Sequence, residues 1–191
     1  MLRSAKAWAT NADADAAGGR QSDQAFDKIK QDIILCRLAP GARFSEVEIS
    51  ARMGFARAAT RAALMRLEEI RFVQPVPRHG FLVTPITVLS IREAFELRSI
   101  VEPQAVAMAV GKVDVARLRA INSAPHKAKG ERAQLALVER NRAFHREIAA
   151  AAGNGRLFHL LESLADEMER LVHMGFFGPT GEASTSTVPT S

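Results

Sequence analysis

Two short helical patterns joined by one glycine, with a tight hairpin directly behind them, most constrain how this chain can fold. "SEVE" is a capping box, because the Ser45 hydroxyl can accept a hydrogen bond from a helix amide while Glu48 reaches back. Gly54 ends this first pattern, and a second helix is expected over residues 56–70. Two helices separated by so short a turn predict a helix-turn-helix.

The elements around this pair complete a small domain. "RFVQPV" and "FLVTP" are two short apolar runs on either side of Pro77–Gly80, which predicts a two-stranded hairpin with glycine in its turn. A third helix is expected before the pair, from Ser22 to the "LAPG" stretch, because its apolar residues recur at helical spacing. The residues before Ser22 are expected to form a disordered tail over 1–21.

The charge of this region favours a polyanionic partner. The chain carries a formal net charge of +5, and residues 25–85 hold ten Lys or Arg against six Asp or Glu. On the second helix of the pair, Arg57 and Arg61 lie four residues apart and project together. They point away from an apolar face that is expected to pack inward, made of Thr60, Ala63, Leu64, Leu67 and Ile70.

This arrangement fits the major groove of DNA, where arginine binds guanine or phosphate. Ala58 lies between Arg57 and Arg61, and its small side chain would let the backbone approach closely. The alternative is a solvated basic face on an ordinary helix. The preceding short helix and the following hairpin favour the DNA interpretation.

The stretch from Phe26 to Pro85 resembles the winged helix-turn-helix of the GntR family of bacterial transcription regulators. The matching residues are Leu38, Pro40, Gly41, Glu46, Gly54, Arg57, Arg61, Ala63, Leu64 and Leu67. The resemblance implies that Arg57 and Arg61 are the principal DNA contacts. Ser45 and Ala58 are then further candidates, and His79 and Gly80 at the wing tip would reach the minor groove or its phosphates.

Five positions depart from the family's pattern: Ala56, Ala59, Thr60, Val47 and Arg71. Ala56 stands where Ser or Thr is usual, and Val47 where many members carry a basic residue. Arg71 replaces a common glycine and would strain the turn if a positive φ is needed there. Because lost phosphate contacts lower affinity and its salt dependence, weaker DNA binding is expected.

Residues 89–173 contain only helical patterns and resemble the start of the FCD-type effector domain that follows such winged helices. "IREAFELRSIVEP" matches its first helix, and "NRAFHREIAAAAGNGRL" its central signature. Arg98 is a candidate ligand for an effector carboxylate, and an ion pair between Arg98 and Glu102 is an equally weighted alternative. The resemblance implies effectors such as small organic acids, sugar acids or fatty acyl compounds.

The resemblance also implies a divalent metal, zinc or a similar ion, held by one Asp and three His. Asn141 and His145 occupy two of these positions, and they are also candidate effector ligands. Asparagine brings no charge, so a weakened or absent metal site is expected, and a packed polar role for His145 is slightly favoured. His126 falls in an expected loop and is interpreted as solvent-exposed.

The expected architecture is mainly α: three helices and a two-stranded β-wing, followed by an all-α helical bundle. The expected domains are residues 22–86 for DNA binding and 87–173 for effector binding and dimerisation. The second domain is expected to be incomplete, with a disordered tail over 174–191, because helices carrying the family's last two histidines are not recognisable there. A shifted reading frame near residue 174 is one hypothesis for this.

The resulting functional hypothesis is a cytoplasmic, homodimeric regulator, most often a repressor, that binds a palindromic operator and responds to a small carboxylate. The single Cys36 excludes an internal disulfide, and no membrane partner is expected. The alternative is a shortened dimerisation or interaction module with weak or no DNA binding. No catalytic arrangement of nucleophile, base or paired carboxylates is recognisable, so an enzyme is not expected.

Overall fold

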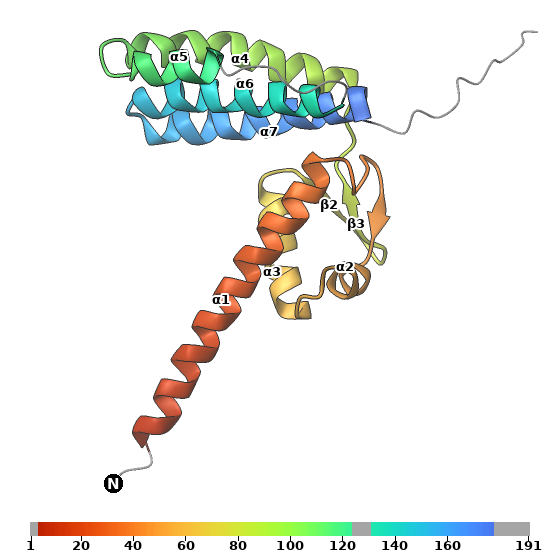
Figure 1. Ribbon diagram of the computed structural model, residues 1–191. Helices are drawn as coiled ribbons and strands as arrows, with labels where there is room; N and C mark the ends of the chain where they lie inside the picture. Colours follow the sequence, from red (N-terminus) through yellow and green to blue (C-terminus); the bar gives the residue numbers. More distant parts are fainter. Residues whose placement is uncertain (1–3, 124–130, 178–191) are drawn as a thin grey trace, which may run out of the picture. The chain divides into compact units, whose positions relative to one another are not determined.

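A long helix opens the chain in the computed structural model, which describes the backbone of residues 4–123 and 131–177 and the side chains of 19–123 and 136–175. Two structural units, Met1–Ile91 and Arg92–Ser191, divide the chain (Figure 1). The elements of the first unit are α1 (Ser4–Ile34), β1 (Arg43–Phe44), α2 (Glu46–Met53), α3 (Arg57–Glu69), β2 (Val73–Val76) and β3 (Gly80–Val83). Those that follow are α4 (Val88–Ala109), α5 (Val115–Ser123), α6 (Glu131–Ala151) and α7 (Gly155–Phe177).

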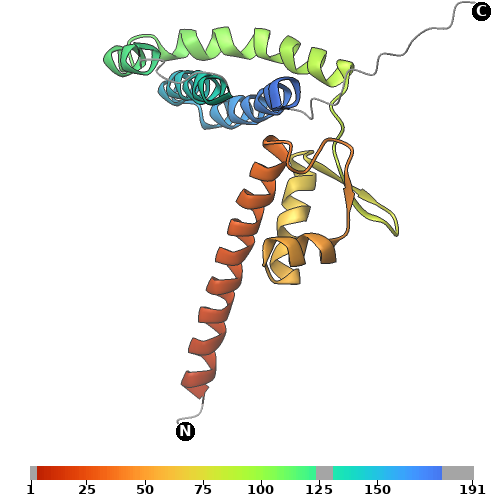
Figure 2. The ribbon, with the colours of Figure 1, turned by 45° about the vertical axis from the view of Figure 1, so that its right-hand side comes forward.

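The core of the first unit lies where the C-terminal half of α1 packs against α3. Ile29 and Ile33 from α1 are fully buried, as are Leu64 and Leu67 from α3. Phe72, just before β2, closes this cluster at 1% exposure. Apolar residues at helical spacing on both helices therefore meet as the periodicity predicts. Helices α1 and α3 lie side by side (Figure 2).

The wing is a three-stranded antiparallel sheet in the order β1-β3-β2. Strands β2 and β3 form the expected hairpin, with Val73 opposite Val83 and Val76 opposite Gly80. A third strand that was not predicted, β1, also pairs with β3. A two-residue strand is too short to show alternation in the sequence, so only its partner reveals it.

Helix α1 differs from the sequence-based expectation at its start. A disordered tail was expected over residues 1–21, whereas the helix begins at Ser4. Seven alanines between residues 5 and 17 supply the physical reason, because alanine has the highest intrinsic helix propensity.

The second unit is helical, as expected. Helix α4 continues through Pro103 without a break, and α7 runs to Phe177, past the expected end near His173. The "GN" turn separates α6 from α7 as predicted: Gly153 takes a φ of 71°, and the Asn154 side chain accepts hydrogen bonds from two amides of α7. His126 and the expected C-terminal tail beyond Phe177 lie outside the described residues.

No helix in the described part of the chain is both long enough and apolar enough to traverse a lipid bilayer.

Candidate nucleic-acid interface and ligand pocket

Helix α3 presents the arginine pair to solvent and buries its opposite face. Arg57, Ala58 and Arg61 are all exposed. Within the described residues, neither the Arg57 nor the Arg61 side chain takes part in an ion pair or hydrogen bond. Two cationic side chains four residues apart are therefore available to an anionic partner.

The opposite face of α3 is the expected one, with a single exception. Thr60, Ala63, Leu64 and Leu67 are fully buried. Ile70, which was expected to join them, is the C-cap residue and remains 38% exposed. The helix ends one residue before Ile70, so its side chain does not point in the direction that the helical period predicts.

The third arginine of α3 has a different role. The Arg66 guanidinium donates to Asp23 of α1 at 2.7 Å and lies 4.1 Å above the centre of the Phe26 ring. Both partners belong to α1, so Arg66 ties the two helices together. It is a positioning residue for the recognition helix and not a third free cation.

The turn between α2 and α3 is held by local hydrogen bonds. Gly54 takes a φ of 74°, which glycine adopts without strain. The buried Ser50 hydroxyl donates to the carbonyl of Phe55 at 2.7 Å. The N-cap of α3 is Ala56, which makes no side-chain cap, so no side chain at this position competes for the first amides of the helix.

Ser45 completes the capping box that the sequence predicts. Its hydroxyl accepts from the Glu48 amide at 3.1 Å, and the Glu48 carboxylate accepts from the Ser45 amide at 2.7 Å. The backbone hydrogen bond from Ser45, followed by the side-chain one, lowers the pKa of Glu48. The proposed contact of Ser45 with DNA stays a prediction, because the cap already explains a serine here.

Replacing Ser45 by alanine is expected to lower the free energy of unfolding by about 1 kcal/mol, because the cap hydrogen bond is lost. Urea denaturation followed by circular dichroism measures this. Because the pKa of Glu48 is lowered on folding, its stabilising contribution is complete above the unfolded value of about 4.3 and disappears as pH falls through the lowered value. An equal loss for Ser45→Thr, which keeps the hydroxyl, would contradict the capping explanation.

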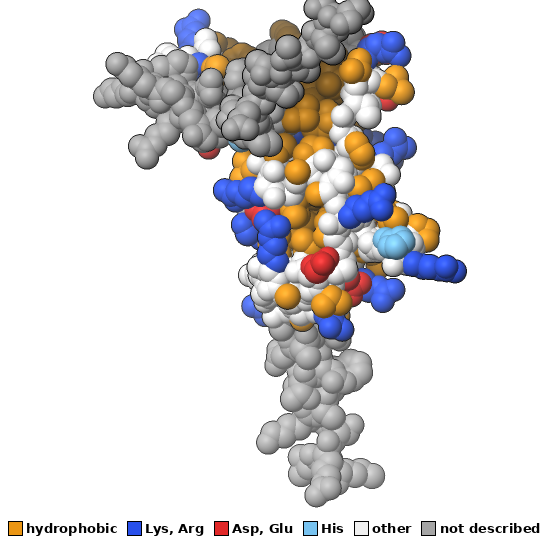
Figure 3. Space-filling view, turned by 90° about the vertical axis from the view of Figure 1, so that its right-hand side faces the viewer, with side chains coloured by type: hydrophobic (Ala, Val, Ile, Leu, Met, Phe, Trp, Pro, Cys, Tyr) orange, Lys and Arg blue, Asp and Glu red, His pale blue; other side chains and the backbone are white. Residues whose placement is uncertain are grey.

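The wing tip carries two exposed basic side chains, Arg78 and His79, next to Gly80. Figure 3 shows Lys and Arg side chains on the face of the molecule that carries the hairpin. Arg78 takes a φ of 65°, which is uncommon outside glycine, and this places it at the bend of the hairpin. Arg78 was not among the predicted DNA contacts, although its charge at a turn was the available signal.

Gly80 has a packing reason that the sequence did not reveal. Its φ is 82°, and a Cβ atom added there would overlap the carbonyl oxygen of Phe44 and lie 2.9 Å from the Cα of Ser45. The wing therefore crosses closely over the residues that lead into α2. This close approach accounts for glycine at the position, and its contact with DNA stays a prediction.

The strain expected at Arg71 is present. Arg71 takes a φ of 62° in the turn between α3 and β2, in the left-handed region that favours glycine. Its amide donates to the carbonyl of Glu68 at 2.8 Å, which closes the end of α3.

In the second unit, a cavity of about 850 Å³ lies among α4, α6 and α7. Its walls are mainly apolar, with Val106, Leu137, Ile148, Leu161 and Met168 among the lining side chains. Its size suits a small molecule. Arg98, Asn141 and His145, the predicted effector residues, all line it.

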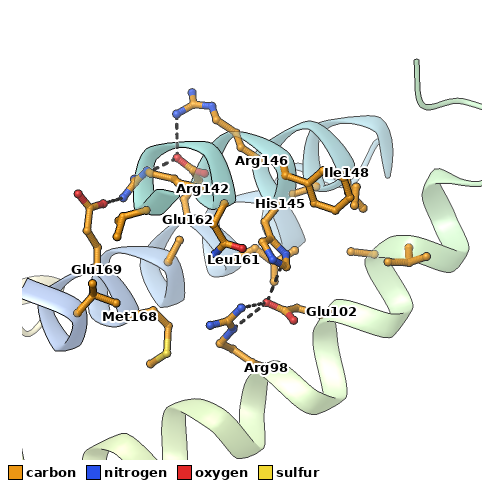
Figure 4. Close-up of a pocket in the computed structure, with 18 of the residues that line it drawn as sticks. Arg98, Glu102, Arg142, His145, Arg146, Ile148, Leu161, Glu162, Met168 and Glu169 are labelled. Carbon is orange, nitrogen blue, oxygen red and sulfur yellow. Dashed lines mark hydrogen bonds and ion pairs between the residues drawn. The ribbon is translucent and has the colours of Figure 1, made fainter. Parts of the chain in front are cut away.

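The polar group of α4 and α6 is shown in Figure 4. The Arg98 Nε donates to the Glu102 carboxylate at 2.7 Å, so the ion pair, one of the two alternatives for Arg98, is formed. His145 Nδ1 lies 3.8 Å from the same carboxylate oxygen. These three side chains are brought together at one edge of the cavity, and the exposed Asn141 lies one turn before His145 on α6.

A second polar group joins α6 to α7 and was missed in the sequence. Arg142 lies 2.7 Å from the carboxylates of both Asp166 and Glu169, and Arg146 lies 3.0 Å from Glu162. Burial alone would lower the pKa of Arg142, but Asp166 and Glu169 outweigh it and raise the pKa. The available signal was the spacing of the three acids, which places them on one face of α7.

The metal site implied by the resemblance does not fit these residues. Asn141 offers no charge, and His145 faces Glu102, which already binds Arg98. Across residues 19–123 and 136–175, no three His, Cys, Asp or Glu side chains are grouped so that they could hold a metal ion.

With these sites in place, comparison with known proteins decides the family. The sequence matches the family described as "Bacterial regulatory proteins, gntR family" over residues 21–83 and the FCD domain over residues 93–187. Together these matches span most of the chain. The chain belongs to the GntR family. The FCD match also runs past His173, the expected end of this domain.

Relatives agree with this assignment. The chain is 25% identical over 158 residues to the HTH-type transcriptional repressor RspR of Escherichia coli, covering 81% of this chain and 69% of that protein. It is 26% identical over 151 residues to an HTH-type transcriptional regulator in an unstable DNA locus of Streptomyces ambofaciens, covering 78% and 63%.

Solved structures share the fold. Escherichia coli McbR/YncC superposes with a TM-score of 0.69 at 24% identity, covering 83% of this chain and 76% of that one. A GntR regulator from a Rhodococcus species gives 0.65 at 23% identity, covering 81% and 75%. This GntR protein is thus a DNA-binding transcription regulator with an FCD effector domain, built on a winged helix-turn-helix followed by helices.

Proposed function

We propose that this GntR protein is a cytoplasmic, homodimeric repressor that binds a palindromic operator and releases it when a small molecule enters the cavity of the FCD unit. The observation that carries the proposal is the exposed arginine pair of α3, Arg57 and Arg61, held on a helix whose opposite face is buried. Ala58, Ser45, His79 and Gly80 are proposed to border this contact. The family is a class of transcription regulators and not an enzyme class.

Exposed apolar side chains on α4 support a dimer. Phe95 is 55% exposed and Ile100 65%. A helix with apolar residues around its circumference is usually buried, so a second copy that covers part of α4 would remove this surface from water. Two winged helices related by a twofold axis would then read two halves of a palindrome.

The cavity supports control by a small molecule. It is lined by α4, α6 and α7, so an occupant would contact all three helices. A ligand that binds more tightly to the arrangement incompatible with the operator would shift the protein away from DNA. The relative named as a repressor, RspR, favours this direction of control.

A carboxylate effector, which the sequence favours, meets an obstacle in the structure. Arg98 is the expected ligand for it, and Arg98 is bound to Glu102. A carboxylate would have to displace the Glu102 side chain or share Arg98 with it. The effector is therefore proposed only as a small molecule at this point. The charged residues that line the cavity decide whether a charged or an uncharged ligand is accepted.

A titration of the full chain against fluorescently labelled DNA from upstream of its own gene tests the proposal. We expect saturable binding that weakens steeply from about 50 to 200 mM salt, because phosphate contacts release counterions. Analytical ultracentrifugation is expected to give about twice the chain mass of 20.8 kDa. No binding by a folded dimer at low salt would instead favour the alternative, a dimerisation or interaction module without regulated DNA binding.

A further inference from the structure

The charges that line the FCD cavity cancel one another, and this bears on what the cavity can bind. Three arginines and three glutamates face it: Arg98, Arg142, Arg146, Glu102, Glu162 and Glu169. The inference from this balance rests on the proposed role of the cavity as the effector site. It concerns the chemical class of the effector.

Each arginine of the cavity is already bound to a carboxylate of the same chain. Glu102 accepts from the Nε of Arg98 at 2.7 Å, and both side chains are only partly exposed, at 30% and 20%. On the other wall, Glu162 binds Arg146 at 3.0 Å. A ligand anion would therefore compete with a carboxylate that is tethered beside the guanidinium and needs no association from solution.

The remaining arginine is the most firmly held. Arg142 lies between Asp166, whose side chain is 3% exposed, and Glu169, each at 2.7 Å. Displacing Asp166 would break a buried ion pair, which is strongly unfavourable. Arg142 is therefore not available to an incoming anion.

Other lining residues add apolar surface and few polar groups. Leu137, Val138, Phe144, Ile148 and Val172 surround the charged edges. An apolar body would be removed from water in this space, whereas an added charge would lose hydration without gaining an uncommitted partner.

We propose that the cavity binds an uncharged, mainly apolar molecule that carries a single hydrogen-bonding group, and that Glu102 excludes carboxylates by occupying Arg98. The cavity then discriminates against carboxylate ligands because the negative charge of Glu102 repels them. His145, beside the Glu102 carboxylate, is suited to hydrogen-bond a hydroxyl or carbonyl group of the ligand.

The test compares two ligands of equal chain length, 1-octanol and octanoate, as competitors of the neutral fluorescent dye N-phenyl-1-naphthylamine on the full chain. We expect 1-octanol to displace the dye at least about tenfold more effectively than octanoate at pH 7.5. Glu102→Gln is expected to make octanoate about tenfold more effective in displacing the dye, because it frees the charged Arg98 side chain to bind the ligand carboxylate. Displacement of the dye by 1-octanol should change little in this variant.

Two variants make the result specific. Glu96→Gln removes a carboxylate from the same helix outside the cavity, where Glu96 faces Arg92, and should leave the preference unchanged. Ala165→Phe fills the cavity and should abolish dye displacement by 1-octanol, with circular dichroism confirming the fold. Displacement that survives Ala165→Phe would place the dye elsewhere and overturn the assignment.

Tighter binding of octanoate than of 1-octanol by the parent chain, unchanged in Glu102→Gln, would overturn the proposal. Binding of neither molecule by the folded chain would overturn it as well. Operator binding is measured separately on DNA, so either failure leaves the proposed DNA-binding function standing, and a loss of DNA binding would leave the ligand preference standing.

Discussion

Replacing Arg57 and Arg61 together by alanine is expected to weaken operator binding by about a hundredfold or more. A good arginine contact with DNA is worth about 1–3 kcal/mol, and two such contacts are lost from one exposed face of α3. Neither side chain supports the fold through an ion pair within the described residues, so stability should change little. Fluorescence anisotropy with labelled operator DNA measures the affinity, and circular dichroism checks the fold.

The salt dependence of this double variant tells which DNA groups the arginines bind. If both contact phosphates, the slope of log affinity against log salt falls by about 2, and all sequences are weakened equally. If they contact bases, the loss is concentrated on the operator sequence. Arg92→Ala/Arg119→Ala, which removes the same charge from α4 and α5, is the matched control. Equal losses in the two double variants would show that net charge alone, and not the recognition helix, binds the DNA.

Replacing Gly80 by alanine is expected to lower the free energy of unfolding by about 2–4 kcal/mol. An L-residue in the left-handed region costs about 1–2 kcal/mol, and overlap with the backbone of Phe44 adds to this. The wing would have to move away from β1, so operator affinity should fall as well. Urea denaturation of the full chain, followed by circular dichroism, gives the stability.

Gly54→Ala is the matched control for this prediction. Gly54 also takes a positive φ, 74°, but an added Cβ would meet nothing within 4 Å. It should therefore show the backbone strain alone, about 1–2 kcal/mol. If Gly80→Ala proves no more destabilising than Gly54→Ala, the close approach of the wing to Phe44 contributes nothing to stability.

The capping interactions of the winged helix-turn-helix are local, and this explains why they were predictable. The Ser45 capping box, the Gly54 turn and the bounds of α3 each depend on residues within about four positions. The two arginines of the recognition helix were predictable for the same reason. Their helical spacing and the buried face opposite them are both properties of one continuous segment.

Errors arose where an element depends on a distant partner or on weak propensity. Strand β1 has two residues and exists through its pairing with β3, some forty positions later. The first residues of α1 are helical because they are rich in alanine. Their apolar residues do not recur at helical spacing, so the sequence pattern did not indicate a helix there. Ile70 fits the helical spacing of the apolar residues in α3 and was therefore expected to be buried, but the helix ends at Glu69.

The sequence by itself determined the family, the two-part organisation, the recognition helix and the candidate effector residues, because local spacing and motif carry that information. Only the tertiary structure decided the state of the arginines. Arg66 of α3 is bound to Asp23 of α1, and Arg142 of α6 is bound to Asp166 and Glu169 of α7. Whether a charged side chain is free or already paired depends on what the fold places within about 3 Å of it, and spacing along one helix cannot specify partners on another.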